Sequence, residues 1–344
     1  MIGLKAWFEP GFFISAVMQN ISTKFKPRTW ARNPHLQTIM GSLKMRAHGR
    51  SPMIESAKET IVDGGDGVRL LGYRSQQSSG RSRGLVTLIH GWEGSSDSTY
   101  VLSMGNYLYD RGYDVFRLNL RDHGESHHLN QGLFHGALIR ETFHSVRNIA
   151  GLSGNKPFYL VGFSLGGNFA LRIAVRHSSS PIPNLTQVVA ISPALDPYKA
   201  TVGIDESLSI YRIYFLDKWK KSLQKKQALF PDRYDFSSIL HHKTCMDLTE
   251  AIMPYFPDFK TYTEYFNQYT LKGAYFDALS VPVTIIASLD DPIITIEDIR
   301  GLKTNDHLAI SLQSYGGHCG FIDFFPFSCW YEGEIESILR SREE

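Results

Sequence analysis

Ser164 lies within the stretch GFSLG, residues 162–166, where a strand pattern gives way to a helix pattern. The continuous apolar run at 157–164 predicts a buried strand, and the pattern of 165–176 predicts a helix. Glycines two positions before and after the serine allow a sharp bend, because no Cβ obstructs it. The bend pushes the hydroxyl out above the sheet, beside helix N–H groups that stabilise a developing anion. We therefore predict that Ser164 is a nucleophile.

A serine hydroxyl is a weak nucleophile at neutral pH, so it needs a base and an acid that orients the base. In a parallel sheet these should follow later strands, in the order serine, acid, histidine. The stretch SLDDPIITIED offers Asp290 and Asp291 after one predicted strand, and YGGHCGFID offers His318 after the last. We predict Asp291 as the acid, because the residue directly before Pro292 lies in the turn, where its side chain can swing toward the histidine. Asp290 would instead point into the loop or cap the next segment.

The oxyanion of a tetrahedral intermediate needs two hydrogen-bond donors. One is the backbone N–H of Leu165, the residue after the serine, and the other should come from the loop after the strand at 84–90. That loop reads HGWEGSS and would supply the backbone N–H of Trp92. The Trp92 side chain would either floor a substrate pocket or pack in the core. Cys319, next to the predicted base, is expected to pack as a small apolar residue.

Six continuous apolar runs predict the strands that position these residues, at 84–90, 114–120, 157–164, 187–194, 282–288 and 308–315. A hairpin at 60–74 precedes them, because turn residues at 63–67 separate two β-prone segments. Helical patterns near 97–111, 134–150 and 165–176 alternate with the strands. Continuous runs are typical of parallel strands covered on both faces, so we predict an α/β fold with a mostly parallel sheet flanked by helices.

The connection between the fourth and fifth of these strands is too long for a simple crossover. Residues 196–276 hold helical, lysine-rich and aromatic segments without a strand pattern. Insertions of this size are usually functional lids. We therefore predict a helical cap at 196–276, inserted into a core formed by 58–195 and 277–344, with residues 1–57 packed on that core.

Composition favours a globular protein with a neutral or small partner. The 344 residues are 42% hydrophobic and carry a formal net charge of +2, so no excess of basic residues indicates nucleic-acid binding. Three cysteines are too few for a disulfide framework and lack the spacing of a zinc site, which favours a reducing cytoplasm. Adjacent histidines, at 127–128 and 241–242, diverge in direction, so we predict surface loops there and no metal site.

The N-terminal stretch GFFISAVM, residues 11–18, is too short to span a bilayer, which needs about 20 residues. Glu9 and Pro10 precede it and no small-residue cleavage site follows, so we expect no signal peptide. The expected role is packing on the domain. The alternative is peripheral membrane contact through Trp7, Phe8, Phe12 and Phe13.

Several stretches together resemble the α/β-hydrolase superfamily, and more narrowly the YheT-like hydrolases, which are related to abhydrolase-domain lipases. They are RNPHLQTI at 32–39, HGWEGSS at 90–96, GFSLGGN at 162–168, DDP at 290–292 and GGHCGF at 316–321. The resemblance implies a triad of Ser164, Asp291 and His318, an oxyanion hole of the Trp92 and Leu165 amides, and activity on carboxylic or lipid esters. RDHGES at 121–126 departs from close relatives, which often carry a cysteine there. The residues themselves give no chemical role for NPHLQT.

The expected reaction is a two-step acyl transfer from a small-molecule or lipid ester to water, which needs no cofactor. An acyltransferase would use the same triad with an alcohol acceptor, and a binding protein on a hydrolase scaffold is a further alternative. A dehalogenase or epoxide hydrolase would carry an aspartate at the nucleophile position. The sequence does not fix the oligomeric state or the acyl chain length.

Aromatic residues in the predicted cap would make its inner side apolar and favour a hydrophobic acyl group, although a purely structural core explains them equally well. They are Tyr211, Tyr214, Phe215, Tyr255, Phe256, Tyr262 and Phe266. Lysines at 218, 220, 221, 225 and 226 predict solvated charge, with contact to anionic lipid as the alternative.

Overall fold

The computed structural model describes residues 24–44, 51–324 and 328–343. The apolar stretch at 11–18 and the aromatic residues near it therefore lie outside the described part of the chain. Within the described ranges, no helix combines the length and the apolar character that a membrane crossing requires.

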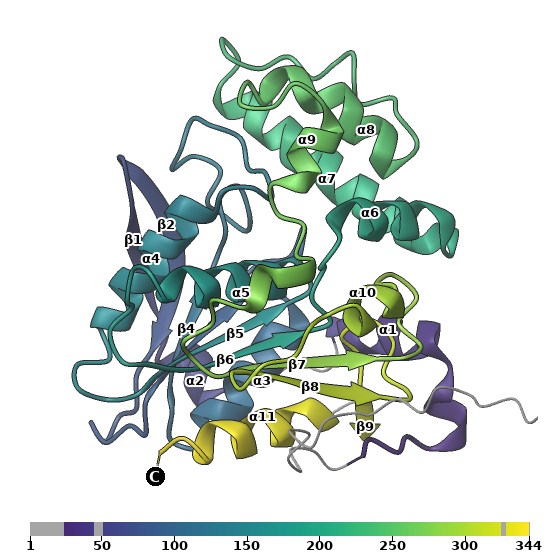
Figure 1. Cartoon of the computed structure of the whole chain (residues 1–344). Helices are drawn as coiled ribbons and strands as arrows, with labels where there is room; N and C mark the ends of the chain where they lie inside the picture. The colour runs from purple at the N-terminus through teal and green to yellow at the C-terminus, as the bar shows by residue number, and fades with distance from the viewer. Residues whose placement is uncertain (1–23, 45–50, 325–327, 344) are drawn as a thin grey trace, which may run out of the picture.

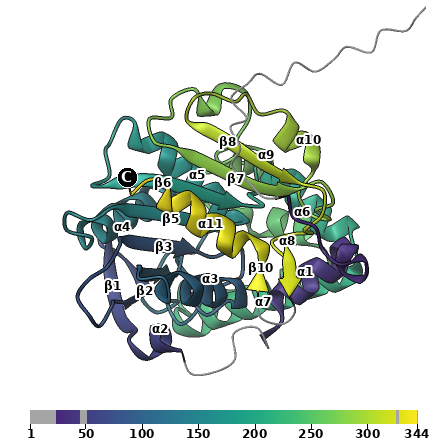
Figure 2. The same cartoon turned by 90° about the horizontal axis from the view of Figure 1, so that it is seen from below.

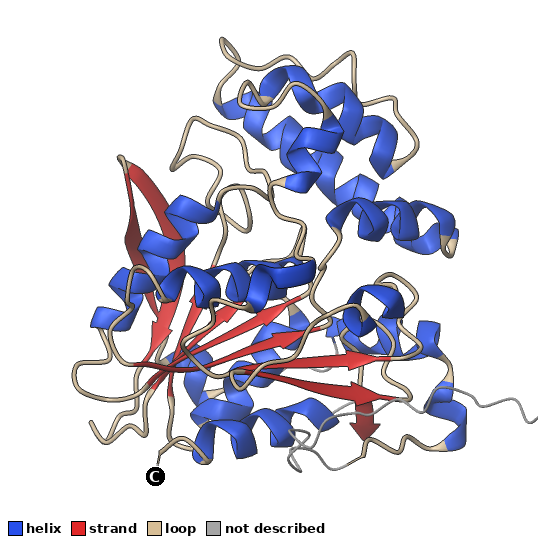
Figure 3. Ribbon diagram, viewed as in Figure 1, coloured by secondary structure: helices blue, strands red, loops and turns tan. Residues whose placement is uncertain are grey.

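In the described residues, eight strands form one sheet in the order β1-β2-β4-β3-β5-β6-β7-β8. They are β1 (Lys58–Gly65), β2 (Val68–Ser75), β3 (Leu85–Ile89), β4 (Asp114–Leu118), β5 (Phe158–Phe163), β6 (Leu185–Ile191), β7 (Val283–Ser288) and β8 (Leu308–Gln313). β2 pairs antiparallel with β1 and β4, whereas the pairs from β4 to β8 are parallel. This mostly parallel sheet, flanked by helices, confirms the predicted fold class (Figure 3).

Helices cover both faces of the sheet. The core helices are α1 (Pro34–Ser42), α2 (Pro52–Glu55), α3 (Thr99–Tyr109), α4 (Ile139–Gly151), α5 (Leu165–His177), α10 (Ile296–Arg300) and α11 (Trp330–Arg340). A 3-10 turn η1 (Thr29–Arg32) precedes α1, and the short strands β9 (Ile322–Phe324) and β10 (Ser328–Cys329) pair before α11. α4 and α5 lie over one face, and α3 and α11 over the other, as the view from below shows (Figure 2).

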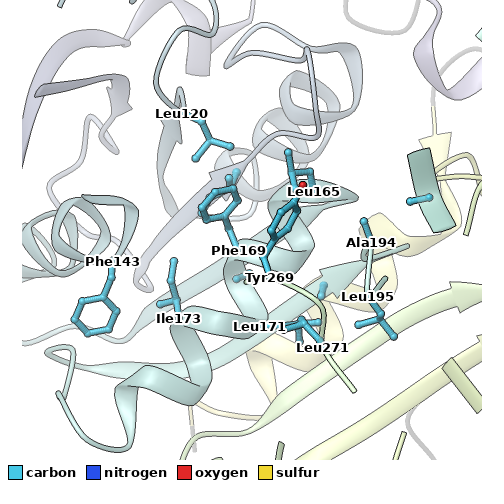
Figure 4. Packing of buried hydrophobic residues seen from close by; sticks show 14 of the residues in the cluster. Leu120, Phe143, Leu165, Phe169, Leu171, Ile173, Ala194, Leu195, Tyr269 and Leu271 are labelled. Atoms are coloured by element: carbon cyan, nitrogen blue, oxygen red, sulfur yellow. The ribbon is translucent and has the colours of Figure 1, made fainter. Parts of the chain in front are cut away.

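The interior of the α4 and α5 side is tightly packed (Figure 4). Phe169 and Ile173 of α5 are fully buried and belong to one apolar cluster with Phe143 of α4 and Leu120. Burying side chains of this size contributes about 1.5–3 kcal/mol each. The helix that follows the predicted nucleophile therefore rests on a rigid base.

A group of helices lies between β6 and β7 in the chain. They are α6 (Pro197–Glu206), α7 (Ser209–Leu229), α8 (Cys245–Ile252), η3 (Met253–Tyr255), α9 (Tyr262–Asn267) and η4 (Gly273–Phe276). Figure 1 shows α6, α7, α8 and α9 together above one end of the sheet, whereas the short turn η4 lies beside α5. These helices fall within the segment 196–276, for which the sequence predicts a cap. The division of the chain into cap and core units stays a prediction.

The helix predicted at 134–150 begins later, at Ile139. Gly136, which is a weak helix former, instead forms hydrogen bonds to two other elements. Its N–H donates to the Tyr265 hydroxyl at 3.0 Å, and its carbonyl accepts from Arg172 Nη2 at 2.6 Å. These bonds hold the turn before α4 against α9 and α5.

Candidate active site

Ser164 lies at the turn between β5 and α5. Its backbone has φ 52° and ψ −116°, a conformation that residues with a side chain rarely adopt, so the turn is strained. A Cβ on Gly162 would lie 2.2 Å from the Gly166 carbonyl oxygen, and one on Gly166 would lie 2.3 Å from that of His90. The strand, the turn and the helix therefore approach each other so closely that both positions require glycine.

The imidazole of His318 connects Ser164 to Asp291. Its Nε2 lies 2.9 Å from Ser164 Oγ, and its Nδ1 lies 2.9 Å from Asp291 Oδ2. A carboxylate only accepts hydrogen bonds, so Nδ1 carries the proton and Nε2 of the neutral ring accepts from the hydroxyl. The His318 and Asp291 side chains are 10% and 3% exposed, so little water competes for these bonds.

The sheet order explains why residues distant in sequence meet here. β5 pairs with β3 and β6, and β7 pairs with β6 and β8, all in parallel. The carboxyl ends of these strands share one edge, which is the usual place for a site in an α/β sheet. The segments after β5, β7 and β8 carry Ser164, Asp291 and His318, respectively.

Asp290 and Asp291 hold the histidine segment in different ways. The second oxygen of Asp291, Oδ1, accepts from the N–H groups of Ile293 and Ile294 at 2.8 and 2.9 Å, which fixes the carboxylate facing His318. Asp290 Oδ1 accepts from the Gly317 N–H at 2.9 Å, and burial raises the pKa of this carboxyl. The bond from Asp290 to the histidine turn is one that sequence reasoning missed.

The loop after β3 reaches the nucleophile. A Cβ on Gly91 would lie 3.2 Å from the Ser164 Cβ. Within the described residues, the N–H groups of Trp92 and Leu165 have no hydrogen-bond partner in the chain. Both predicted donors therefore lie on segments beside Ser164, and their role as an oxyanion hole stays a prediction.

Neighbouring polar groups hold this loop in place. The Gly91 N–H donates to the Tyr100 hydroxyl at 3.0 Å, and the Glu93 N–H donates to His123 Nε2 at 3.2 Å. Burial lowers the pKa of His123 to about 4, so its Nε2 remains an acceptor at neutral pH. Burial raises the pKa of Glu93 to about 8, so this carboxyl places little negative charge beside the loop at neutral pH.

A pocket that opens to solvent adjoins Ser164 and His318. The helices between β6 and β7 line much of it with apolar and aromatic side chains: Ile204, Phe215, Trp219, Ile252, Phe256, Tyr265 and Phe266. The Trp92 ring also lines the pocket and stacks on Phe215, with ring centroids 5.4 Å apart. Trp92 therefore both bounds the pocket and packs against α7.

Lys226 of α7 is fully buried, so the prediction of solvated charge was wrong for this lysine. Its ammonium group lies 2.7 Å from Asp122 Oδ1 and donates to the carbonyl oxygens of His127 and Asn130. The Lys226 and Asp122 side chains are 1% and 4% exposed. Three acceptors replace water around the buried charge, as a buried ammonium requires.

The prediction of a surface loop was also wrong for His127, which is buried. Its Nε2 lies 2.8 Å from Ser222 Oγ of α7, while the adjacent His128 is exposed. Cys319 is buried in the apolar cluster beneath α3 and α11, where burial raises the pKa of its thiol. In the part of the chain that the structure describes, no group of three His, Cys, Asp or Glu side chains is placed to hold a metal ion.

Comparison with known proteins supports the predicted fold class and the family resemblance. The profile of the family described as alpha/beta hydrolase fold matches residues 84–211. YheT of Escherichia coli (strain K12) is 22% identical over 327 residues, which cover 92% of this chain and 93% of YheT. These matches confirm the resemblance to the α/β-hydrolase superfamily that the sequence motifs indicate. The similarity of this chain to YheT supports the YheT-like branch in particular.

Other similar proteins are named as phospholipases or esterases. The phospholipase ABHD3 of Mus musculus is 21% identical over 328 residues, which cover 92% of this chain and 77% of ABHD3. Among solved structures, the esterase Pf2001 of Pyrococcus furiosus has a TM-score of 0.54 at 17% identity, covering 87% of this chain and 98% of that chain. A bacterial membrane phospholipase A has a TM-score of 0.52 at 16% identity, covering 88% and 92%. These structural likenesses concern the fold.

Proposed function

We propose that this protein cleaves carboxylic esters with an apolar acyl group, such as lipid esters, through a covalent acyl-enzyme. The observation that carries the proposal is the pair of 2.9 Å contacts that joins Ser164 through His318 to Asp291. The name of the mouse relative, a phospholipase, supports ester hydrolysis in general.

In the first step, Ser164 Oγ attacks the ester carbonyl carbon while His318 Nε2 takes its proton. Asp291 keeps the other ring nitrogen protonated and stabilises the imidazolium that forms. The carbonyl oxygen becomes an oxyanion, which the Trp92 and Leu165 N–H groups would hold. Collapse of this intermediate breaks the ester bond, and His318 gives its proton to the leaving alcohol.

In the second step, a water molecule attacks the acyl-serine. His318 takes a proton from the water, and a second oxyanion forms in the same place. The proton then returns to Ser164 Oγ as the carboxylic acid leaves, so the enzyme is regenerated without any cofactor.

The pocket lining favours a substrate with an apolar acyl group. Its lining is dominated by aromatic and aliphatic side chains, and these include Phe215 and Trp219 of α7 close to Trp92. Burying each additional methylene in such a lining contributes about 0.8 kcal/mol. We therefore expect kcat/KM to rise about fourfold with each added methylene until the pocket is full.

A series of p-nitrophenyl esters, from acetate to palmitate, tests the function. We expect the wild-type protein to release p-nitrophenol, and Ser164→Ala to lower kcat by at least ~10⁴-fold. Ser145→Ala is the matched control, because Ser145 is a buried serine of α4 whose hydroxyl lies near the Asp63 carbonyl oxygen, away from the pocket lining. This variant should retain wild-type turnover.

Each contrary result identifies a different error. Equal turnover in wild type and Ser164→Ala would contradict the nucleophile. A rate that falls steadily from acetate onward would contradict an apolar acyl pocket. Turnover that appears only when an alcohol acceptor is added would favour an acyltransferase.

A further inference from the structure

The stretch RNPHLQTI, residues 32–39, forms the start of α1, which lies against the histidine segment. Asn33 caps the helix, since its side chain accepts from the Leu36 N–H at 3.0 Å. Pro34 occupies the first helical position, where a missing N–H leaves no helical bond unmade. This start of the helix turns Gln37 and Thr38 inward, and both side chains are buried.

Gln37 attaches α1 to the residues that follow His318 in the chain. Its side-chain amide donates to the Ile322 carbonyl oxygen at 3.3 Å and accepts from the Ile322 N–H at 2.5 Å. The same amide nitrogen donates to the Ala31 carbonyl oxygen at 2.7 Å. With three hydrogen bonds and 1% exposure, this side chain joins η1, α1 and β9 rigidly.

Thr38 contacts the backbone of His318 itself. Its Oγ1 accepts from the His318 N–H at 2.9 Å and donates to the Pro34 carbonyl oxygen at 2.8 Å, one turn earlier in the helix. The Tyr211 hydroxyl of α7 lies beside the same oxygen. The Thr38 hydroxyl therefore has a fixed orientation, and it ties His318 to a helix that lies 280 residues earlier in the chain.

Glycines allow the histidine segment to lie directly on α1. A Cβ on Gly317 would lie 2.3 Å from the Pro34 carbonyl oxygen and 2.6 Å from Thr38 Oγ1. A Cβ on Gly320 would lie 2.4 Å from the Gln37 carbonyl oxygen. Glycine has the greatest backbone freedom of all residues. This segment therefore needs contacts with another part of the chain to hold the His318 imidazole in one position.

We infer that Thr38 is a positioning residue. Its hydroxyl accepts a hydrogen bond from the backbone N–H of His318 and thereby fixes the position of the His318 imidazole. The inference rests on the proposed function of Ser164, His318 and Asp291. The ring must reach Ser164 and Asp291 at once, each at 2.9 Å, so a small backbone shift lengthens at least one of the two contacts. A shift of 1 Å in such a site costs about 100-fold in rate.

Thr38→Val tests the inference, because valine keeps the shape and removes the hydroxyl. We expect kcat for a p-nitrophenyl ester to fall about 10- to 100-fold while KM changes less than about threefold, since the pocket lining is untouched. Thr38→Ser keeps the hydroxyl and should restore most of kcat. If Thr38→Val does not fold, Thr38→Ala removes the same hydroxyl without a second methyl against the segment.

Thr142→Val is the matched control. Thr142 is also buried, and its hydroxyl donates to the carbonyl oxygen four residues earlier, Leu138, at 3.0 Å. Its α4 lies outside the pocket lining, so this variant should lose similar stability and keep wild-type kcat. Tyr211→Phe removes the α7 hydroxyl and leaves the Thr38 to His318 bond, so it should also keep kcat near that of wild type.

The outcomes separate this inference from the proposed function. If wild-type turnover depends on Ser164 but Thr38→Val keeps full kcat, the positioning role is overturned and the function stands. If kcat falls as much in Thr142→Val or Tyr211→Phe as in Thr38→Val, the positioning role is also overturned. The effect would then come from lost stability or from the contact with α7. Absence of Ser164-dependent turnover in wild type would overturn both.

Discussion

Asp291→Asn is expected to lower kcat by about 10⁴-fold, while Asp290→Asn, one residue away, lowers it by less than about tenfold. Asp291 Oδ2 faces His318 Nδ1 at 2.9 Å, and only an acceptor there keeps the ring in the tautomer that can take the serine proton. An asparagine can present its NH₂ group instead, which favours the opposite tautomer. The protein should still fold, because the carbonyl of the introduced asparagine can accept from the turn N–H groups.

The neighbouring carboxyl provides the matched control. Asp290 Oδ1 accepts from the Gly317 N–H, and an asparagine carbonyl can accept the same bond. Among the described residues, its second oxygen is buried and makes no hydrogen bond, so an amide there breaks no bond to that atom. Comparing kcat of Asp291→Asn and Asp290→Asn on one ester shows which of the two carboxylates orients His318. A larger loss in Asp290→Asn would move the acid to position 290.

Gly166→Ala is expected to lower the free energy of unfolding by about 3 kcal/mol or more and to abolish turnover. Its Cβ would lie 2.3 Å from the His90 carbonyl oxygen and 2.4 Å from that of Ile89. These are backbone atoms at the end of a central strand, so α5 or the loop before Trp92 would have to move. Either shift displaces an oxyanion donor relative to Ser164.

Gly151→Ala is the control for this substitution. Gly151 ends α4, and a Cβ there would meet no atom within 4 Å. Alanine should leave the urea midpoint unchanged or raise it slightly, because it restricts the unfolded chain. A urea midpoint and turnover close to wild type in Gly166→Ala would contradict the close approach at the serine turn.

The turn at Ser164 and the strands around it were predictable because their signals are local. An apolar run, two glycines and a helical period lie within about 20 residues. Each of these patterns predicts the backbone conformation of the residues that carry it. The order of strands and the sharing of one sheet edge then follow from general rules of parallel sheets. These rules bring the segments of Asp291 and His318 near the serine without any knowledge of contacts.

Contacts between distant segments were not predictable in the same way. Thr38 and His318 are 280 residues apart, and nothing in NPHLQT by itself indicates which segment the threonine accepts from. Lys226 was expected in solvent because lysines in a charged helix usually are, yet Asp122 and two backbone carbonyls surround it. Tertiary partners decide such cases, and a single sequence does not name them.

The most direct test of the central claim is the mass of the protein after reaction with a fluorophosphonate, which phosphonylates activated serines and stays attached. The account predicts one adduct per chain, located by fragmentation on the peptide that contains Ser164, absent in Ser164→Ala and much slower to form in Asp291→Asn. No adduct on wild type, or an adduct on another residue that persists in Ser164→Ala, would contradict the account.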